Sequence, residues 1–338
     1  MKVSVALCTY NGALFIEEQL KSIAQQTRVP DEVLILDDRS TDSTVELIDA
    51  VCKQYQLSCA IQINATRLGV EANFSCALGK TTGDVIFFCD QDDVWLPEKV
   101  AKMTAPFERD ETVTLVYSDG YIVGPNLEST EYTLFSRSPN KKLLDGDTRD
   151  VGDLLRQGRA PGIKASSVAF TSRIRDVVGP VPEGVAHDSW VAFWGYALGR
   201  VVAIHEPLYY YRRHNQTAGG SSTNKLIPGL NNLKEVEPLI PLREKAHLAQ
   251  CVYAKSCEVE RGMAGKITLS PRFQVLKIAA QEAARTLKAR EAIIGSSGRL
   301  HRIRKGIVSL WQGDYVAIPG YRQKLKMFCH DIDLGKRR

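Results

Sequence analysis

The sequence has no apolar run of about 18 residues, the minimum for a membrane-spanning helix, so we predict no transmembrane segment. It also has no small-residue cleavage site after a long apolar stretch near Met1, and we expect no signal peptide. Its eight cysteines include no Cys-x-x-Cys pair and no internal repeat is visible. We interpret the cysteines as reduced core residues of a cytoplasmic protein.

The two signs of charge are unevenly distributed: basic residues are few in the first third of the chain, and acidic residues are the minority in the remainder. Residues 1–120 carry 10 Lys and Arg against 19 Asp and Glu, whereas the remainder has a net charge of +14. An acidic first third fits a site that needs a cation, and a basic remainder fits a surface that meets phosphate, nucleic acid or anionic lipid. With 338 residues, 44% of them hydrophobic, we expect one large domain with an appendage, or two domains.

Apolar runs alternate with helical periodicity at the start of the chain. Four strands are predicted, over residues 3–8, 32–36, 59–63 and 85–89. The helices between them are predicted from Leu14 to Gln26, over 43–55 and over 71–80. This spacing is typical of βαβ units, so we predict an α/β fold with a mainly parallel sheet flanked by helices. Residues 124–150 are polar and predict loops, and residues after about 229 are mostly helical.

Three carboxylates, Asp90, Asp92 and Asp93, follow the apolar run 85–89 directly. Such a run predicts a strand buried on both faces, and open α/β sheets place ligands at the carboxyl ends of such strands. Unpaired charge at this density requires a cation, and Mg²⁺ or Mn²⁺ accept carboxylate oxygens. A competing interpretation is an acidic surface turn, although a solvated turn needs no buried strand to place it.

Two further strand ends carry polar residues. Thr9, Tyr10 and Asn11 end the first strand, and Asp37 and Asp38 end the second. A carboxylate at this edge can accept from a base N–H or a ribose hydroxyl, and a tyrosine ring can lie against a base. The competing interpretation of the two aspartates is a helix-capping turn. Taken together, the three strand ends predict a nucleotide site.

Two later segments complete the candidate set. Asp188 opens a predicted helix and is a hypothetical general base, or else a helix N-cap. Arg212 or Arg213 would contact a diphosphate, and His214 would complete a metal shell or bind phosphate. A strand end with solvated charges is the alternative for this second segment.

These residues resemble successive motifs of the family 2 glycosyltransferases, whose catalytic domain has the GT-A fold. The motifs lie in residues 9–12 (Thr-Tyr-Asn-Gly), 36–44 (Leu-Asp-Asp-Arg-Ser-Thr-Asp-Ser-Thr), 67–69 (Arg-Leu-Gly), 90–99 (Asp-Gln-Asp-Asp-Val-Trp-Leu-Pro-Glu-Lys) and 187–190 (His-Asp-Ser-Trp). The resemblance spans about residues 3–215. It implies transfer of a sugar from a nucleotide diphosphate donor to an acceptor hydroxyl, with inversion at the anomeric carbon.

The resemblance also implies roles for single residues. Asp38 would contact the base, Thr9 and Tyr10 would line the nucleotide pocket, and Arg67 would lie by the base or phosphate. We add Asn11, from the same strand end, to the predicted nucleotide-sugar site. In the acidic motif Asp90 or Asp92 would approach the ribose, and Asp92 or Asp93 would hold the metal. Asp188 would take the acceptor proton. His187 is a departure, because an acidic residue is frequent at that position in the family.

The donor and acceptor follow from the same likeness. The Asp-Gln-Asp-Asp-Val-Trp form most resembles bacterial rhamnosyltransferases of O-antigen and capsule assembly, so we predict dTDP-rhamnose as donor and a glycan or lipid-linked acceptor. A UDP-hexose transferase is the alternative within the family. A sugar nucleotidyltransferase would want a Gly-rich phosphate loop after the first strand, where this chain has Thr-Tyr-Asn-Gly. A nucleic-acid-binding protein is disfavoured because the basic residues are scattered.

We therefore predict a catalytic domain over 1–222, with a nucleotide-sugar half over about 1–120 and an acceptor half over about 121–222. A helical region over 223–338 follows. Residues 299–338 carry 10 Lys and Arg against 3 Asp and Glu. They suit either a helix on an anionic membrane, at the inner face of the cytoplasmic membrane, or helices packed on the catalytic domain with a solvated basic face.

Overall fold

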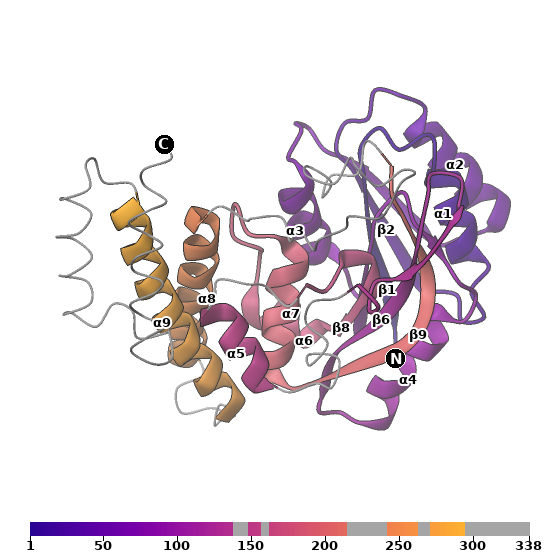
Figure 1. Cartoon of the computed structure of the whole chain (residues 1–338). Coiled ribbons are helices and arrows are strands. Elements are labelled where there is room, and N and C mark those ends of the chain that lie inside the picture. Colours follow the sequence, from indigo (N-terminus) through magenta and orange to yellow (C-terminus); the bar gives the residue numbers. More distant parts are fainter. Residues whose placement is uncertain (138–147, 157–161, 215–241, 263–270, 295–338) are drawn as a thin grey trace. The chain divides into compact units, whose positions relative to one another are not determined.

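The structure is a computed structural model of the chain (Figure 1), and it describes residues 1–137, 148–156, 162–214, 242–262 and 271–294. The chain divides into two compact units. The first contains residues 1–146 and 162–238, and the second contains residues 147–161 and 239–338. The predicted domain boundary near residue 222 lies outside the described residues and stays a prediction.

The first unit is built on one mixed sheet with the order β3-β2-β1-β4-β8-β6-β9-β5, and β7 pairs with β6. The strands are β1 (Val3–Thr9), β2 (Glu32–Asp37), β3 (Cys59–Ile63), β4 (Val85–Cys89), β5 (Val94–Trp95), β6 (Val113–Val123), β7 (Ser129–Thr133), β8 (Val168–Thr171) and β9 (Arg200–Arg212). Neighbours among β1 to β4 are parallel, as are β6 and β9. β8 runs antiparallel to both β4 and β6, which makes the sheet mixed rather than wholly parallel.

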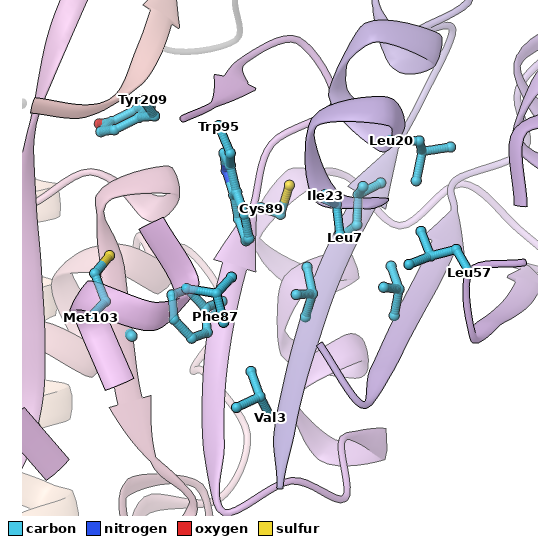
Figure 2. Close-up of a cluster of buried hydrophobic side chains, with 14 of the residues drawn as sticks. Val3, Leu7, Leu20, Ile23, Leu57, Phe87, Cys89, Trp95, Met103 and Tyr209 are labelled. Carbon is cyan, nitrogen blue, oxygen red and sulfur yellow. The ribbon is translucent and has the colours of Figure 1, made fainter. Parts of the chain in front are cut away.

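Helices cover both faces of this sheet. They are α1 (Ile16–Ala24), α2 (Thr44–Tyr55), α3 (Val70–Lys80), α4 (Lys99–Arg109), α6 (Ser172–Val178), α7 (His187–Leu198) and the short 3₁₀ helix η2 (Ala165–Ser167). Alternate residues of β4 point to opposite faces. Phe87 joins the core that contains side chains of α1, α2 and α4, part of which Figure 2 shows. Phe88 meets Phe74 of α3 on the other face. Burial of β4 on both faces explains its wholly apolar sequence.

The predicted α/β fold is confirmed, and the first four strands and three helices agree with the structure to within two residues at each end. The prediction of loops over residues 124–150 is wrong in two places. β7 pairs with β6 there, and helix α5 (Thr148–Arg156) begins at Thr148. β7 is short and mostly exposed, with the sequence Ser-Thr-Glu-Tyr-Thr, so its pairing depends on the neighbouring β6 rather than on an apolar pattern.

The prediction that all cysteines are reduced is also wrong, because Cys52 and Cys59 form a disulfide. Cys52 lies near the end of α2, and Gln56 after it has a left-handed backbone with φ of 52°. This residue turns the chain back, so that Cys59 at the start of β3 comes within 6.2 Å of Cys52 between Cα atoms. A reversal after a helix is a tertiary feature that cysteine spacing alone does not reveal.

The second unit contains α5, α8 (Leu242–Gly262) and α9 (Pro271–Ile294). α5 packs on α9 through an ion pair between Arg156 and Glu282, with a nitrogen–oxygen distance of 2.7 Å. The helical character predicted for the end of the chain is seen in α8 and α9, whereas the basic residues 299–338 lie outside the described residues. None of the helices that the structure describes combines the length and apolarity needed to cross a membrane.

Candidate active site

The sheet brings three of the predicted strand ends to one edge. β1 lies between β2 and β4, with Thr9 opposite Asp37 and Leu7 opposite Cys89. The residues that follow these strands therefore emerge side by side. The Gln91 side chain, from the segment after β4, hydrogen-bonds to the main chain of Tyr10. The edge thus joins the predicted nucleotide residues to the acidic motif, which lies in residues 90–93.

Asp38 and Arg67 meet on the nucleotide side of this edge. The Asp38 carboxylate, 3% exposed, accepts hydrogen bonds from the backbone N–H groups of Leu68 and Gly69, at 2.7 and 2.8 Å. It also accepts one from Asn64 Nδ2 at 3.0 Å. The loop held in this way places the Arg67 guanidinium 3.8 Å from the centre of the Tyr10 ring. In this structure Asp38 is therefore an anchor for the loop that carries Arg67.

Thr9 and Asn11 are engaged with the segment that follows β2. Thr9 is buried and its hydroxyl donates to Asp37 Oδ2 at 2.8 Å. Asn11 has a φ of 48°, a left-handed conformation that asparagine tolerates better than most residues. Its side-chain oxygen accepts from the backbone N–H of Thr41 at 2.8 Å. Both residues shape the walls of the predicted pocket, and their contact with a nucleotide stays a prediction.

Asp90 lies between the two halves of the candidate site. Its Oδ2 accepts a hydrogen bond from the hydroxyl of Ser166 at 3.1 Å, and its backbone N–H donates back to the same hydroxyl. Burial and the neighbouring charge of Asp92 raise its pKa to about 7, against the hydrogen bond from Ser166. The charge of Asp188 adds to this rise in pKa. His187, the residue before Asp188, contacts Phe88 of β4 with ring centres 5.4 Å apart, so the start of α7 lies beside the strand that leads into the acidic motif.

Asp92 and Asp93 face different surroundings. Asp92 Oδ2 is 2.8 Å from His214 Nε2, and both side chains retain some solvent exposure. Asp93 is 1% exposed and its Oδ1 accepts from the backbone N–H of Arg212 at 3.0 Å, while Oδ2 has no hydrogen-bond partner. Burial, then the charge of Asp92, raises the pKa of Asp93 well above its ordinary value. Asp93 thus differs from Asp92 in its burial and in its hydrogen-bond partner.

The Asp92–His214 pair fits a divalent cation. A carboxylate oxygen and an imidazole nitrogen at hydrogen-bond distance are ligand types that Mn²⁺ and related ions share. The predicted trio of Asp92, Asp93 and His214 is not assembled as such. In the part of the chain that the structure describes, no three His, Cys, Asp or Glu side chains are placed to hold one ion. Any further ligands would come from a substrate or water.

Arg212 lies beneath the acidic motif. Its side chain is 2% exposed, and its Nε donates to the backbone oxygen of Asp92 at 2.7 Å. Its terminal nitrogens donate to the backbone oxygen of Pro125 and to the Glu18 carboxylate. With these donors committed to protein acceptors, Arg212 fixes the shape of the motif here. Its contact with a diphosphate stays a prediction.

Asp188 lies in the first turn of α7, and its Oδ1 accepts from the hydroxyl of Ser189 at 3.1 Å and from the backbone N–H of Ser189. His187, the departure from the family pattern, is buried and stacks on Phe74 with ring centres 3.9 Å apart. Burial lowers the pKa of His187, so at neutral pH it is an uncharged part of the apolar wall. The lone carboxylate of this motif is therefore Asp188.

Three side chains of the site have no role in the sequence-based prediction: Gln91, Lys99 and Ser166. Lys99, fully buried at the start of α4, donates from Nζ to the backbone oxygen of Ser166 at 2.8 Å. Ser166 in turn holds Asp90. Lys99 is 67 residues away from Ser166 in the chain. The only sequence signal is a lysine at the end of the motif in residues 90–99, which indicates a helix start and nothing about burial.

Lys99 gives a testable pH dependence of stability. Burial lowers its pKa from 10.5 to about 7. Between these values the unfolded chain binds a proton that the folded protein lacks, so the free energy of unfolding rises with pH, by at most about 1.4 kcal/mol per pH unit from this group. We expect Lys99→Met to lose this rise between pH 7 and about 7.5, where cysteines with an ordinary pKa of about 8.5 are still mostly protonated. Urea denaturation across this range measures it.

Lys53→Met is the matched control, because the Lys53 side chain is 75% exposed on α2. It should keep the wild-type pH dependence. Parallel stability curves for wild type and Lys99→Met would contradict a buried, weakly basic Lys99.

Comparison with known proteins gives a consistent picture. Residues 4–160 match the family model for glycosyl transferase family 2. A Shigella flexneri protein described as dTDP-rhamnosyl transferase RfbG is 38% identical over 233 residues, which cover 64% of this chain and 74% of RfbG. An uncharacterized glycosyltransferase of Nostoc sp. is 27% identical over 67% of this chain and 70% of its own length.

Among solved structures, that of S. aureus TarS in complex with UDP-GlcNAc aligns with a TM-score of 0.57 and 18% identity, over 93% of this chain and 92% of that one. At this identity the alignment is informative about the fold alone. The fold agrees with the one expected from the resemblance in sequence, and the RfbG match establishes the family. The chain belongs to glycosyltransferase family 2 and has the GT-A fold.

Proposed function

We propose that this glycosyltransferase is an inverting, metal-dependent enzyme that moves rhamnose from dTDP-rhamnose to a hydroxyl of a glycan or lipid-linked acceptor in cell-surface polysaccharide synthesis. The observation that carries the proposal is the convergence of three kinds of group on one region of the first unit. These are the Tyr10–Arg67 stack, the Asp92–His214 pair and the Asp188 carboxylate at the start of α7, where His187 contacts Phe88 of β4. The donor needs a surface for its base and a cation site for its diphosphate, and the attacking hydroxyl needs a carboxylate that accepts its proton.

Tyr10 and Arg67 form the nucleotide end of the proposed site. The Tyr10 ring offers a face for a base, and the Arg67 guanidinium offers charge near a base or phosphate. Asp38 supports this end through the loop that it anchors. Donor binding then depends on a loop of residues 67–69, whose position is set by two backbone hydrogen bonds to one carboxylate.

Asp92 and His214 would hold Mg²⁺ or Mn²⁺. When bound, such an ion neutralises negative charge that grows on a departing diphosphate. Asp93 would support this site from beneath, through the backbone of Arg212. This division of labour differs from the symmetrical one implied by three adjacent carboxylates in the sequence.

Asp188 would act as the general base. As the acceptor oxygen forms its bond to the anomeric carbon, the hydroxyl proton passes to the Asp188 carboxylate, and the bond between that carbon and the diphosphate oxygen breaks with its electron pair on the diphosphate. Attack from the face opposite the diphosphate inverts the anomeric centre. Because the pKa of Asp90 is raised to about 7, this carboxyl is partly protonated at neutral pH and adds less negative charge to the site than a fully ionised aspartate would.

The choice of donor is supported by the RfbG relative, which is described as a dTDP-rhamnosyl transferase. A UDP-hexose donor is the alternative, and the TarS structure contains UDP-GlcNAc in the same fold. Phosphate transfer by a nucleotidyltransferase is disfavoured, because the backbone N–H groups of Tyr10 to Ala13 are all engaged by protein side chains. They are not arranged to cradle a phosphate.

We also propose a cytoplasmic location with peripheral attachment at the inner face of the cytoplasmic membrane. A lipid-linked acceptor would give the basic residues 299–338 a purpose there, because Lys and Arg favour anionic lipid surfaces. We propose no nucleic-acid partner, because the basic residues are scattered along the chain.

A donor screen tests the proposed function. Purified protein is incubated with dTDP-rhamnose, UDP-glucose, UDP-galactose or UDP-GlcNAc, each with Mn²⁺, with Mg²⁺ or with a chelator, and released nucleotide diphosphate is measured. We expect turnover with a metal ion and dTDP-rhamnose, and its loss with the chelator. Turnover of a UDP-sugar alone would move the donor assignment to UDP-hexoses. Failure of every donor with both metals would overturn the proposal.

A further inference from the structure

Gln91 is the residue between Asp90 and Asp92, and its side chain makes two hydrogen bonds to the backbone of one residue. Gln91 Oε1 accepts from the Tyr10 N–H at 2.8 Å, and Gln91 Nε2 donates to the Tyr10 carbonyl at 3.1 Å. The register of β1 and β4 ends at Leu7 and Cys89. The amide of Gln91 therefore continues the contact between the two chain segments beyond the last backbone pair, as a peptide group would.

The neighbouring Gly12 leaves the space that this arrangement needs. A Cβ added at Gly12 would come within 2.3 Å of Gln91 Oε1 and 2.6 Å of Gln91 Cδ. The three nearest atoms to such a Cβ all belong to Gln91. Gly12 does not have a positive φ, so an alanine there would meet the Gln91 side chain without backbone strain. The glycine is thus explained by the path of one side chain.

The other amides of this loop are held from a different direction. The N–H groups of Asn11, Gly12 and Ala13 donate to side-chain oxygens of Ser40, Thr44 and Asp42, which lie between β2 and the start of α2. Tyr10, by contrast, is held from the acidic motif. Gln91 consequently links the backbone of Tyr10, whose ring lies against the Arg67 guanidinium, to the segment that holds Asp92, the partner of His214.

We propose that Gln91 is a positioning residue: it holds Tyr10 in register with the acidic motif and so sets the affinity for the nucleoside diphosphate part of the donor. The inference rests on the proposed function, because it assumes that the donor spans from Tyr10 to Asp92. A donor of fixed length binds well only when both ends of its site keep their separation. Groups that are already held in their binding positions raise affinity, because less conformational entropy is lost when the ligand binds.

The test uses Gln91→Ala, with Gln54→Ala on the exposed face of α2 as the matched control. Binding of UDP and dTDP with Mn²⁺ is measured by calorimetry, and KM and kcat are measured with the donor found in the screen. We expect Gln91→Ala to raise the Kd of the nucleotide and the KM of the donor by about tenfold, because binding must then order the Tyr10 segment that Gln91 holds in the wild type, with a smaller change in kcat. Gln54→Ala should change neither.

Two double-mutant cycles separate positioning from general destabilisation. In a Tyr10→Ala background, Gln91→Ala should raise the Kd no further, because the ring that it positions is gone. Gly12→Ala should mimic Gln91→Ala in the wild-type background, by displacing the same side chain. In the Gln91→Ala background Gly12→Ala should add little, because a Cβ then meets no glutamine. Gly12→Ala keeps the test available if Gln91→Ala does not fold.

The outcomes distinguish the inference from the function on which it rests. If the wild type binds neither UDP nor dTDP, the proposed function fails. If the wild type binds nucleotide and Gln91→Ala binds it equally well, the positioning role is overturned. Effects of Gln91→Ala that are the same with and without the Tyr10 ring would likewise overturn it, because they would show that Gln91 does not act through Tyr10.

Discussion

Asp188→Asn is expected to lower sugar transfer by about 10²- to 10⁴-fold, the usual contribution of a general base, while nucleotide binding stays unchanged. Asparagine has the shape of aspartate but does not take up the acceptor proton. Its side-chain oxygen can still accept the hydrogen bonds that Asp188 Oδ1 receives from Ser189. The start of α7 should therefore keep its structure. Single-turnover transfer assays and calorimetry with UDP or dTDP measure the two properties separately.

Asp176→Asn is the control for this substitution, because Asp176 is an exposed aspartate on α6 that forms an ion pair with the adjacent Arg175. It should transfer sugar at the wild-type rate. A loss of nucleotide affinity in Asp188→Asn would contradict the general-base role and would make Asp188 a ligand of the donor site or a structural group. Unchanged transfer would remove Asp188 from the mechanism altogether.

Local sequence predicts those site residues whose positions are set by a buried strand directly before them. The run 85–89 is apolar throughout, so it had to be a buried strand, and Asp90 had to emerge at its end. The same reasoning applies to Thr9 at the end of β1 and to Asp38 directly after β2. Parallel neighbours bring their carboxyl ends to one edge. The fold and the meeting of these three segments therefore follow from hydrophobic pattern alone.

What the sequence leaves open is the set of partners that each carboxylate finds. The contact of Asp38 with a base stays a prediction, whereas the structure shows its carboxylate accepting hydrogen bonds from the backbone N–H groups of residues 68 and 69, 30 and 31 positions along the chain. Asp90 finds Ser166, 76 positions away. Neither partner has a local signal, because serine and backbone amides occur everywhere. Only the closed fold decides which of them comes within hydrogen-bond distance.

Burial separates carboxylates that look equivalent in the sequence. Asp92 and Asp93 are adjacent, so any sequence-based argument offers both as metal ligands. In the structure the chain turns between them, and one carboxylate pairs with His214 while the other lies under the backbone of Arg212. The environment, rather than the residue type, then sets which carboxylate stays charged and reachable.

This separation leads to a second large effect, in which Asp92→Asn and Asp93→Asn behave differently. Asp92→Asn should abolish tight Mn²⁺ binding and lower transfer by about 10²- to 10³-fold, since a metal ion contributes several kcal/mol of charge stabilisation. Binding of Mn²⁺ itself, followed through the loss of the free-ion signal in electron paramagnetic resonance, is a readout independent of turnover. His214→Ala should weaken Mn²⁺ binding in the same direction, because it removes the paired imidazole.

Asp93→Asn is the matched comparison, because it makes the same chemical change one residue away. Asparagine can keep the hydrogen bond that Asp93 Oδ1 accepts from Arg212, and it removes a buried group whose pKa is already raised by burial. We expect its Mn²⁺ affinity to stay within about threefold of wild type, less than the tenfold that 1.4 kcal/mol represents. Equal losses of Mn²⁺ affinity in both variants would mean that the two carboxylates share the ion. An Asp93 carboxylate under the Arg212 backbone would then have to turn outward when metal binds.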